Sequence, residues 1–237
     1  MTKYKVATPK LNWETVKEDA KSFEADSKEI CELAIKQGAN LAKLIEAAHV
    51  VCDERVTLKC RIPPCESYGV NLMCPPFSPT ATETASIVAK YKWGILLAVE
   101  TTVPQKHWEW IQREGVPYCK MWRERKYALF YEQFAIPYWR KLHDIVMMVE
   151  REGHNRGYFF AVGYVSWSCY LCWRKGTSGK KAFDFCNTNA PCIRPYEARP
   201  SMEASGIDVY STYKNAGLEL KMASQEKLAF SGLVLVV

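Results

Sequence analysis

The chain lacks the features that would place it in a membrane, secreted or nucleotide-binding class. No apolar run approaches the roughly 18 residues that a membrane helix requires, and no charged-then-apolar leader opens the chain. The sequence contains no Walker loop, no G-x-G-x-x-G motif after an expected strand and no nucleophile elbow. We therefore expect a cytoplasmic protein without membrane association, and nucleotide, dinucleotide and serine-hydrolase functions have no support.

Clusters of basic residues and of histidine are also missing. The formal net charge is +6, but Lys and Arg are dispersed and the densest run spans only residues 123–126. Dispersed positive charge does not support nucleic-acid binding. The four histidines have no partner at a metal-binding spacing, so we expect surface or core roles for His49, His107, His143 and His154.

Cysteine is the one residue type in excess. The 237 residues, 48% of them hydrophobic and 24% charged, can bury a core without disulfides, and neither a repeat nor a linker divides them. We therefore expect a single domain over residues 1–237. Ten cysteines in a reducing compartment, below the roughly 8% of a secreted disulfide scaffold, favour metal or redox chemistry.

Hydrophobic periodicity predicts alternating helices and strands. Helices are expected over 26–38, over 80–94 with a Thr80–Glu83 capping box, and over 128–153 with a bend at Pro137. Strands are expected over 55–62, 95–99, 158–165 and 233–237, the first of them half-buried and carrying Cys60 inward. This order indicates an α/β layered domain with a mixed sheet, flanking helices and two cysteine-rich metal-binding loops.

Seven cysteines fall in two segments, 60–77 and 167–200, that also hold seven of the twelve prolines, and an eighth, Pro79, follows the first segment closely. Proline fixes φ and removes an amide donor, so such loops can hold thiolates at set positions. The first segment offers three ligands in a C-x4-C-x8-C array, Cys60, Cys65 and Cys74. Structural zinc takes four ligands, whereas a cubic iron-sulfur cluster held at three corners leaves one iron open. Cys52 would serve as a fourth ligand only if the preceding strand folded back.

The second segment offers four ligands in a C-x2-C and a C-x5-C pair, Cys169, Cys172, Cys186 and Cys192. The thirteen residues between the pairs resemble a zinc ribbon, but the second pair lacks the two-residue gap of a zinc knuckle, which iron-sulfur ligation tolerates better. If they surround the sulfurs in space, five aromatic residues would exclude water: Trp167, Tyr170, Trp173, Phe183 and Phe185. The remaining cysteines, Cys31, Cys52 and Cys119, are expected to be small core residues.

At these motifs the chain resembles a family of predicted metal-binding proteins of anaerobes, domain-of-unknown-function family 2284. The resemblance rests on the strings at residues 55–60, 65–69, 74–76 and 192–209. It implies a metal, above all iron-sulfur, and no particular reaction. Residues 174–184 look like an insertion relative to the family's usual spacing, which leaves the ligand role of Cys186 less secure.

These observations predict an iron-sulfur protein with two 4Fe-4S clusters, acting as a small reductase or a redox subunit. Electrons would enter at the four-cysteine site, from a ferredoxin or a larger enzyme, and the open iron could take a small-molecule ligand. Weak candidates for proton transfer or anion binding are Glu66, Tyr68, Arg199 and Glu203, although residues 198–209 also suit a scaffold role. Two alternatives stay open: a non-catalytic electron carrier or assembly factor, and a zinc-stabilised interaction module. A bound organic cofactor is also open.

Overall fold

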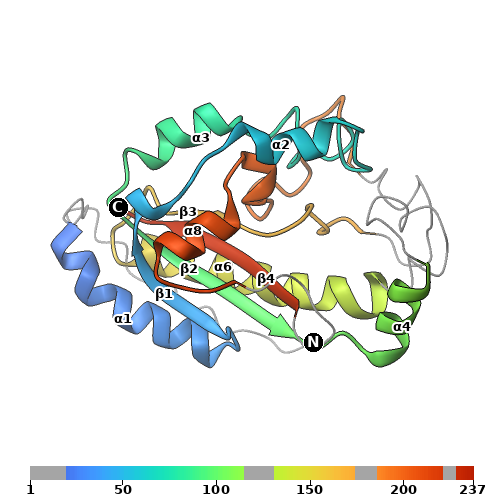
Figure 1. Ribbon diagram of the computed structural model, residues 1–237. Helices are drawn as coiled ribbons and strands as arrows, with labels where there is room; N and C mark the ends of the chain where they lie inside the picture. Colours follow the sequence, from blue (N-terminus) through green and yellow to red (C-terminus); the bar gives the residue numbers. More distant parts are fainter. Residues whose placement is uncertain (1–19, 115–130, 174–185, 221–227) are drawn as a thin grey trace.

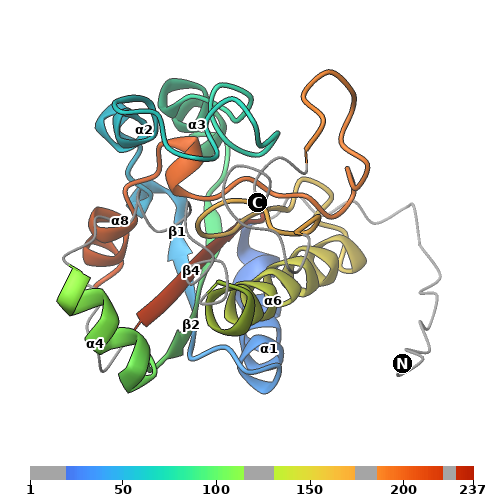
Figure 2. The ribbon, with the colours of Figure 1, turned by 90° about the vertical axis from the view of Figure 1, so that its right-hand side faces the viewer.

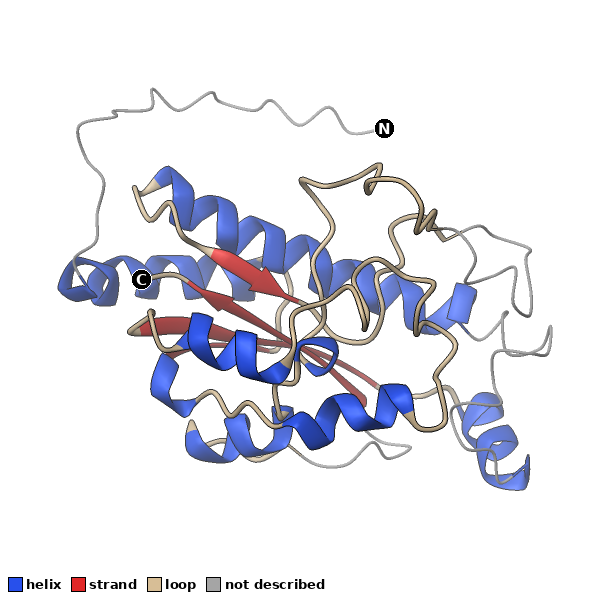
Figure 3. Ribbon diagram, turned by 90° about the horizontal axis from the view of Figure 1, so that it is seen from above, coloured by secondary structure: helices blue, strands red, loops and turns tan. Residues whose placement is uncertain are grey.

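The structure is built on a four-stranded sheet with helices on both faces (Figures 1 and 3). The computed structural model describes residues 20–114, 131–173, 186–220 and 228–237. The strands are β1 (Leu41–Glu46), β2 (Trp93–Thr101), β3 (Val162–Tyr164) and β4 (Leu228–Leu235), in the order β1-β2-β4-β3. The α/β class is confirmed, but every strand pairing is antiparallel, so the expectation of a mixed sheet is wrong.

Helices α1 (Ala20–Lys36) and α6 (Ile136–Asn155) cover one face of the sheet, as Figure 2 shows from the side. The opposite face carries the short helix η1 (Ala47–His49), α8 (Val209–Asn215) and, beyond them, α2 (Glu54–Arg61) and α3 (Ala81–Val88). The π-helical turn η3 (Tyr131–Ala135) leads into α6, the 3-10 turn η4 (Glu203–Ser205) precedes α8, and α4 (Gln105–Glu114) follows β2. No helix within the described ranges has both the length and the apolar character needed to cross a membrane.

The central strands are buried on both faces, as their continuous apolar runs predict. Ile95, Leu97 and Val99 of β2 pack in the core beneath α1 and α6. Leu96 points the other way, into a second core that also contains Tyr213. Alternate residues of a strand face opposite sides of the sheet, so a strand covered twice needs apolar residues throughout.

Two expected helix ends are confirmed at the level of single residues. Thr80 accepts a hydrogen bond from the Glu83 N–H at 3.2 Å, and Glu83 Oε2 accepts one from the Thr80 N–H at 2.8 Å, which completes the capping box of α3. Gly38 follows α1 with φ of +98°, a left-handed conformation that glycine adopts without strain.

Residues 54–61 form α2, so the expected strand over 55–62 is wrong. Asp53 caps this helix by accepting the Arg55 N–H at 2.8 Å. The alternation of apolar and basic residues has no buried face behind it, since α2 buries none of its residues and Leu58 is 47% exposed. Alternation indicates a strand only where one face is covered. Cys60 therefore stands at the end of a helix.

Two other boundaries differ from expectation. Within residues 158–165, only Val162–Tyr164 form a strand, because Tyr158 instead packs its ring on Phe23 and donates its hydroxyl to Asp26 Oδ2 at 2.8 Å. The bend expected at Pro137 coincides with the change from the π-helical turn to α6. A proline in the first turn of a helix costs no hydrogen bond, which explains its place there.

Candidate metal centre

The first cysteine group comes from the end of α2 and the loop that follows it. The thiols of Cys60 and Cys65 are hydrogen-bonded to each other, which raises the pKa of Cys60 and lowers that of Cys65. The Cys65 sulfur also accepts the backbone N–H groups of Ser67 and Tyr68, which further lowers its pKa. Hydrogen bonds to the charged form favour it, so this turn is built to hold Cys65 as a thiolate.

Cys74, the third member, is only 4% exposed. Burial raises the pKa of its thiol to about 12, and the negative charges of Cys65, Cys169 and Cys186 add to the increase. Cys74 Sγ lies 3.5 Å from Ser168 Oγ, a hydrogen bond that acts in the opposite direction. Cys74 is therefore close enough to members of both groups to feel their charge.

The second cysteine group lies partly in the core. Cys169 is 6% exposed, and burial raises the pKa of its thiol to about 12, with smaller contributions from the charges of Cys186, Cys172 and Cys192. The Leu171 N–H opposes this shift by donating to the Cys169 sulfur. The thiol charges that act on Cys169 thus come from the other cysteines of its own segment.

Backbone N–H groups also reach sulfurs of the 186–200 segment. Leu72, from the first loop, donates to Cys186, which lowers a pKa that burial raises. Arg194 donates its N–H to Cys192 Sγ at 3.4 Å. In both loops, sulfurs are therefore oriented by backbone donors, the kind of outer contact that fixes the position of a metal-binding side chain.

Direct hydrogen bonds join the two cysteine loops. The buried side chain of Asn71 donates to the Cys169 carbonyl at 3.0 Å and accepts the Met73 N–H at 3.0 Å. Ser168 Oγ donates to Ser67 Oγ at 2.7 Å. Segments about a hundred residues apart are thus joined directly by side-chain hydrogen bonds.

Replacing Asn71 by Ala is expected to lower the free energy of unfolding by about 1–3 kcal/mol, because it removes the buried partner of two backbone groups. Urea unfolding of the metal-free protein measures this change. Asn187→Ala is the matched control, since Asn187 is exposed and accepts only the Asn189 N–H, and we expect a change within about 0.5 kcal/mol. Equal stability of the two variants would contradict the role of Asn71 as a link between the loops.

The side chains are not arranged as a finished metal site. Within the described ranges, no three Cys, His, Asp or Glu side chains gather at a spacing that could hold a metal ion. The donor set is nevertheless one that soft metals and iron-sulfur clusters prefer, since it consists of thiols in two adjacent groups with backbone N–H groups directed at the sulfurs.

Comparison with known proteins decides the family. A family model described as "Predicted metal-binding protein (DUF2284)" matches residues 43–236, which include both cysteine groups. The chain belongs to this family. No curated protein and no solved structure matches the chain.

The DUF2284 chain places two of the weak sequence candidates beside the first cysteine group. Glu66 is half-buried, and its charge raises the pKa of Cys65. Tyr68 is also half-buried and contributes its N–H to the Cys65 sulfur.

The other two candidates, Arg199 and Glu203, lie in the segment between the second cysteine loop and α8. Arg199 pairs through two nitrogens with the buried carboxylate of Glu150, with Arg199 Nε 2.8 Å from Glu150 Oε2. Glu203, in η4, has its pKa raised by burial, and the charge of Glu203 raises that of Cys60. In the same segment Asp208 caps α8 through the Ser211 N–H at 3.1 Å, a scaffold role.

Cysteines outside the two groups occupy core positions in this DUF2284 structure. Cys31 packs against the main core, and burial raises its pKa to about 11. Cys52 packs against the second core and pairs with Ile207 in an isolated bridge. Cys119, Phe183 and Phe185 lie outside the described residues. Two histidines bond to backbone carbonyls, His143 to Glu197 and His154 to Ala161.

Asn71, Ser67 and Ser168 are missed by sequence reasoning. Nothing in their spacing marks them, because each acts on a partner from the other loop. Trp167 carries a signal only in the structure, where its φ of 62° is exceptional for a bulky residue. Its N–H donates to the carboxylate of Glu203.

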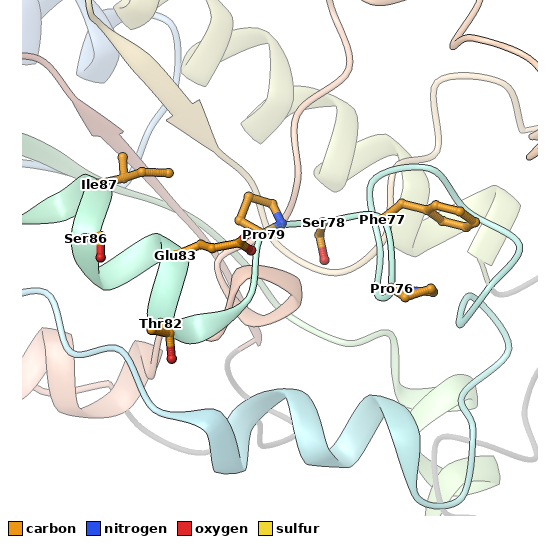
Figure 4. A pocket seen from close by; sticks show the side chains of 8 residues that line it. All are labelled: Pro76, Phe77, Ser78, Pro79, Thr82, Glu83, Ser86 and Ile87. Carbon is orange, nitrogen blue, oxygen red and sulfur yellow. The ribbon is translucent and has the colours of Figure 1, made fainter.

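A groove of about 590 Å³ adjoins the first loop, between α3 and the residues that follow Cys74 (Figure 4). It is lined by Pro76, Phe77, Ser78, Pro79, Thr82, Glu83, Ser86 and Ile87. Its carboxylate, Glu83, is bonded to Thr80 in the capping box, and Thr82 donates its hydroxyl to Glu54. The polar groups that line the groove are thus partly used by local structure.

Proposed function

We propose that the protein holds two 4Fe-4S clusters, one on Cys60, Cys65 and Cys74 and one on Cys169, Cys172, Cys186 and Cys192. The observation that carries the proposal is that thiols from both loops lie close enough to act on one another's charge, while backbone N–H groups bond to sulfur in both loops. When bound, such clusters supply one-electron transfer, and an iron without a thiolate can bind a ligand.

The surroundings of the two groups differ in a way that suits a small reductase or redox subunit. Cys169 lies in the main core, against which Cys192, Trp167 and Trp173 also pack. Tyr170 packs edge-on against Trp139 and Trp173, with ring centroids 5.3 and 5.8 Å apart, so aromatic rings lie beside the buried Cys169. A four-thiol group with aromatic neighbours suits electron entry from a ferredoxin or a larger enzyme.

The first group differs from the second in having possible proton donors beside it. Cys60 and Cys65 are half-buried, and Glu66 and Tyr68 are next to Cys65. These residues would deliver or take up protons for a small molecule bound there. Arg194 lies near Cys169 and Cys172, whose charges help to raise the Arg194 pKa, so the two groups have different charged neighbours.

Metal and sulfide analysis of protein prepared without air tests the proposal. We expect about eight iron and about eight sulfide per chain, with little zinc. One or two zinc ions without sulfide would overturn the proposal and favour a zinc-stabilised interaction module. An electron-resonance spectrum that is unchanged by added small ligands would show two closed clusters, which favours the electron carrier or assembly factor over the reductase.

A further inference from the structure

Glu203 has a buried carboxylate, and one of its two oxygens has no hydrogen-bond partner. Its own N–H, the Ser201 hydroxyl and the Trp167 N–H donate to the carboxylate. The oxygen Oε2 is buried and has no hydrogen-bond partner. Burial of a charged oxygen without a partner is costly, and native structures compensate it with a cation, a metal or a proton.

Other buried or paired glutamates of the chain meet an arginine. Glu150 is paired with Arg199, and Glu197 is paired with Arg194. No such ion pair to Glu203 occurs within the described ranges. The structure links Glu203 to the first cysteine group, because η4 packs against α2, which carries Cys60, and the Glu203 charge acts on the Cys60 thiol.

The position of Glu203 bears on which group binds the fourth iron of a cluster that only three cysteines hold. Cys60 is hydrogen-bonded to Cys65 and feels the charges of Cys74 and Glu203, so the carboxylate of Glu203 lies within electrostatic range of the three-cysteine array. Three thiolates leave one iron of a cubic cluster without a protein ligand. A carboxylate is a harder ligand than a thiolate and suits soft metals less well.

We propose that Glu203 supplies the fourth ligand of the three-cysteine site, through the buried oxygen that has no other partner. This inference rests on the proposed function. The carboxylate binds the iron that lacks a thiolate, and any proton it carries is released to solvent. Because oxygen is the less suited ligand, an incoming small molecule displaces it more readily than it would displace a cysteine, so the site stays available to a ligand.

Electron resonance in water enriched with ¹⁷O tests this assignment on the full-length protein, loaded with clusters without air and then reduced. If Glu203 occupies the fourth position, the wild-type signal of the first cluster is not broadened by ¹⁷O-water. In Glu203→Ala, water takes the vacated position and the signal broadens. Glu203→Gln, which keeps the shape of the side chain, should broaden in the same way. Glu54→Gln, an exposed position on α2, is the matched control and should behave like wild type.

Broadening of the wild-type signal to the same extent as that of Glu203→Ala would overturn the assignment. A broadened wild-type signal rejects the assignment without any variant, so that part of the test survives a variant that fails to fold or to load. An unbroadened wild-type signal is assigned to Glu203 only when a Glu203 variant broadens, because another ligand such as Cys52 would also exclude water. Wild-type protein that takes up no iron or sulfide would instead reject the proposed function, which keeps the two failures distinct. As a second measurement, mild oxidation should release iron from Glu203→Ala about tenfold faster or more, and an unchanged rate in both Glu203 variants would also count against the assignment.

Discussion

Cys74→Ala is expected to remove about half of the bound iron while the domain stays folded. If each cysteine group holds one 4Fe-4S cluster, the loss of a ligand from the first group removes that cluster and leaves the other. The substitution deletes one small buried atom, and its structural cost is about 1 kcal/mol. Iron and sulfide content after anaerobic loading measures the loss, and far-ultraviolet circular dichroism verifies the fold.

The complementary variant is Cys186→Ala, which should remove the other half of the iron. Its outcome also tests the ligand that is least secure from sequence, because residues 174–184 look like an insertion just before it. Cys31→Ala is the matched control: Cys31 packs against the core outside both groups, and its loss should leave the iron content unchanged. Unchanged iron in both Cys74→Ala and Cys186→Ala would reject the division into two sites.

The Cys74→Ala variant also tests whether Cys74 affects the second cysteine group as well as the first. The charges of Cys65 from the first group, and of Cys169 and Cys186 from the second, all act on Cys74. A site at such a junction is where electrons would cross between the groups. If the second cluster of Cys74→Ala keeps its spectrum, then Cys74 belongs to the first site only, as its spacing predicts.

The helices and strands were predictable from the sequence where local chemistry agreed with burial. The capping box of Thr80 and Glu83 and the doubly buried strand around Ile95 are of this kind. Residues 54–61 differ from the predicted strand because their alternating apolar residues have no buried face, and because Asp53 caps the segment as a helix. Alternation of apolar and polar residues predicts a strand only where one face of the segment is packed against the rest of the protein.

The sequence predicts which cysteines are candidate ligands, but it does not predict the residues that link their loops. Two proline-rich loops indicated which cysteines belong together, since the constraint lies within each loop. Asn71 and Ser168 act across about a hundred residues, so no local pattern marks them. Glu203 was weighed from the sequence as a possible proton carrier, whereas its buried free oxygen depends on the packing of η4 against α2.

Arg199→Ala is expected to lower the free energy of unfolding by about 3–5 kcal/mol, because it leaves the Glu150 carboxylate buried without its cation. The side chains of Arg199 and Glu150 are only 16% and 5% exposed, and Glu150 Oε2 also accepts the Gly163 N–H at 2.7 Å. The fit is close, since a Cβ on Gly163 would lie 3.0 Å from that oxygen. Urea unfolding of the metal-free protein measures the loss.

Arg194→Ala is the matched control for burial. Arg194 also pairs with a glutamate, but its side chain and that of Glu197 are 35% and 49% exposed, so solvent screens the pair and we expect a loss of about 1 kcal/mol or less. The double variant Arg199→Ala with Glu150→Gln separates charge from packing, because it removes the stranded charge while the introduced amide oxygen can still accept the Gly163 N–H. It should recover part of the lost stability.

Similar stability of Arg199→Ala and Arg194→Ala would contradict a scaffold role for Arg199 and would favour the alternative role of Arg199 in binding an anion. If the large loss of stability is found, the role of Arg199 is structural, because its ion pair with Glu150 connects the segment after the second cysteine loop to α6. Glu203 is then the carboxylate that remains available to the first cysteine site.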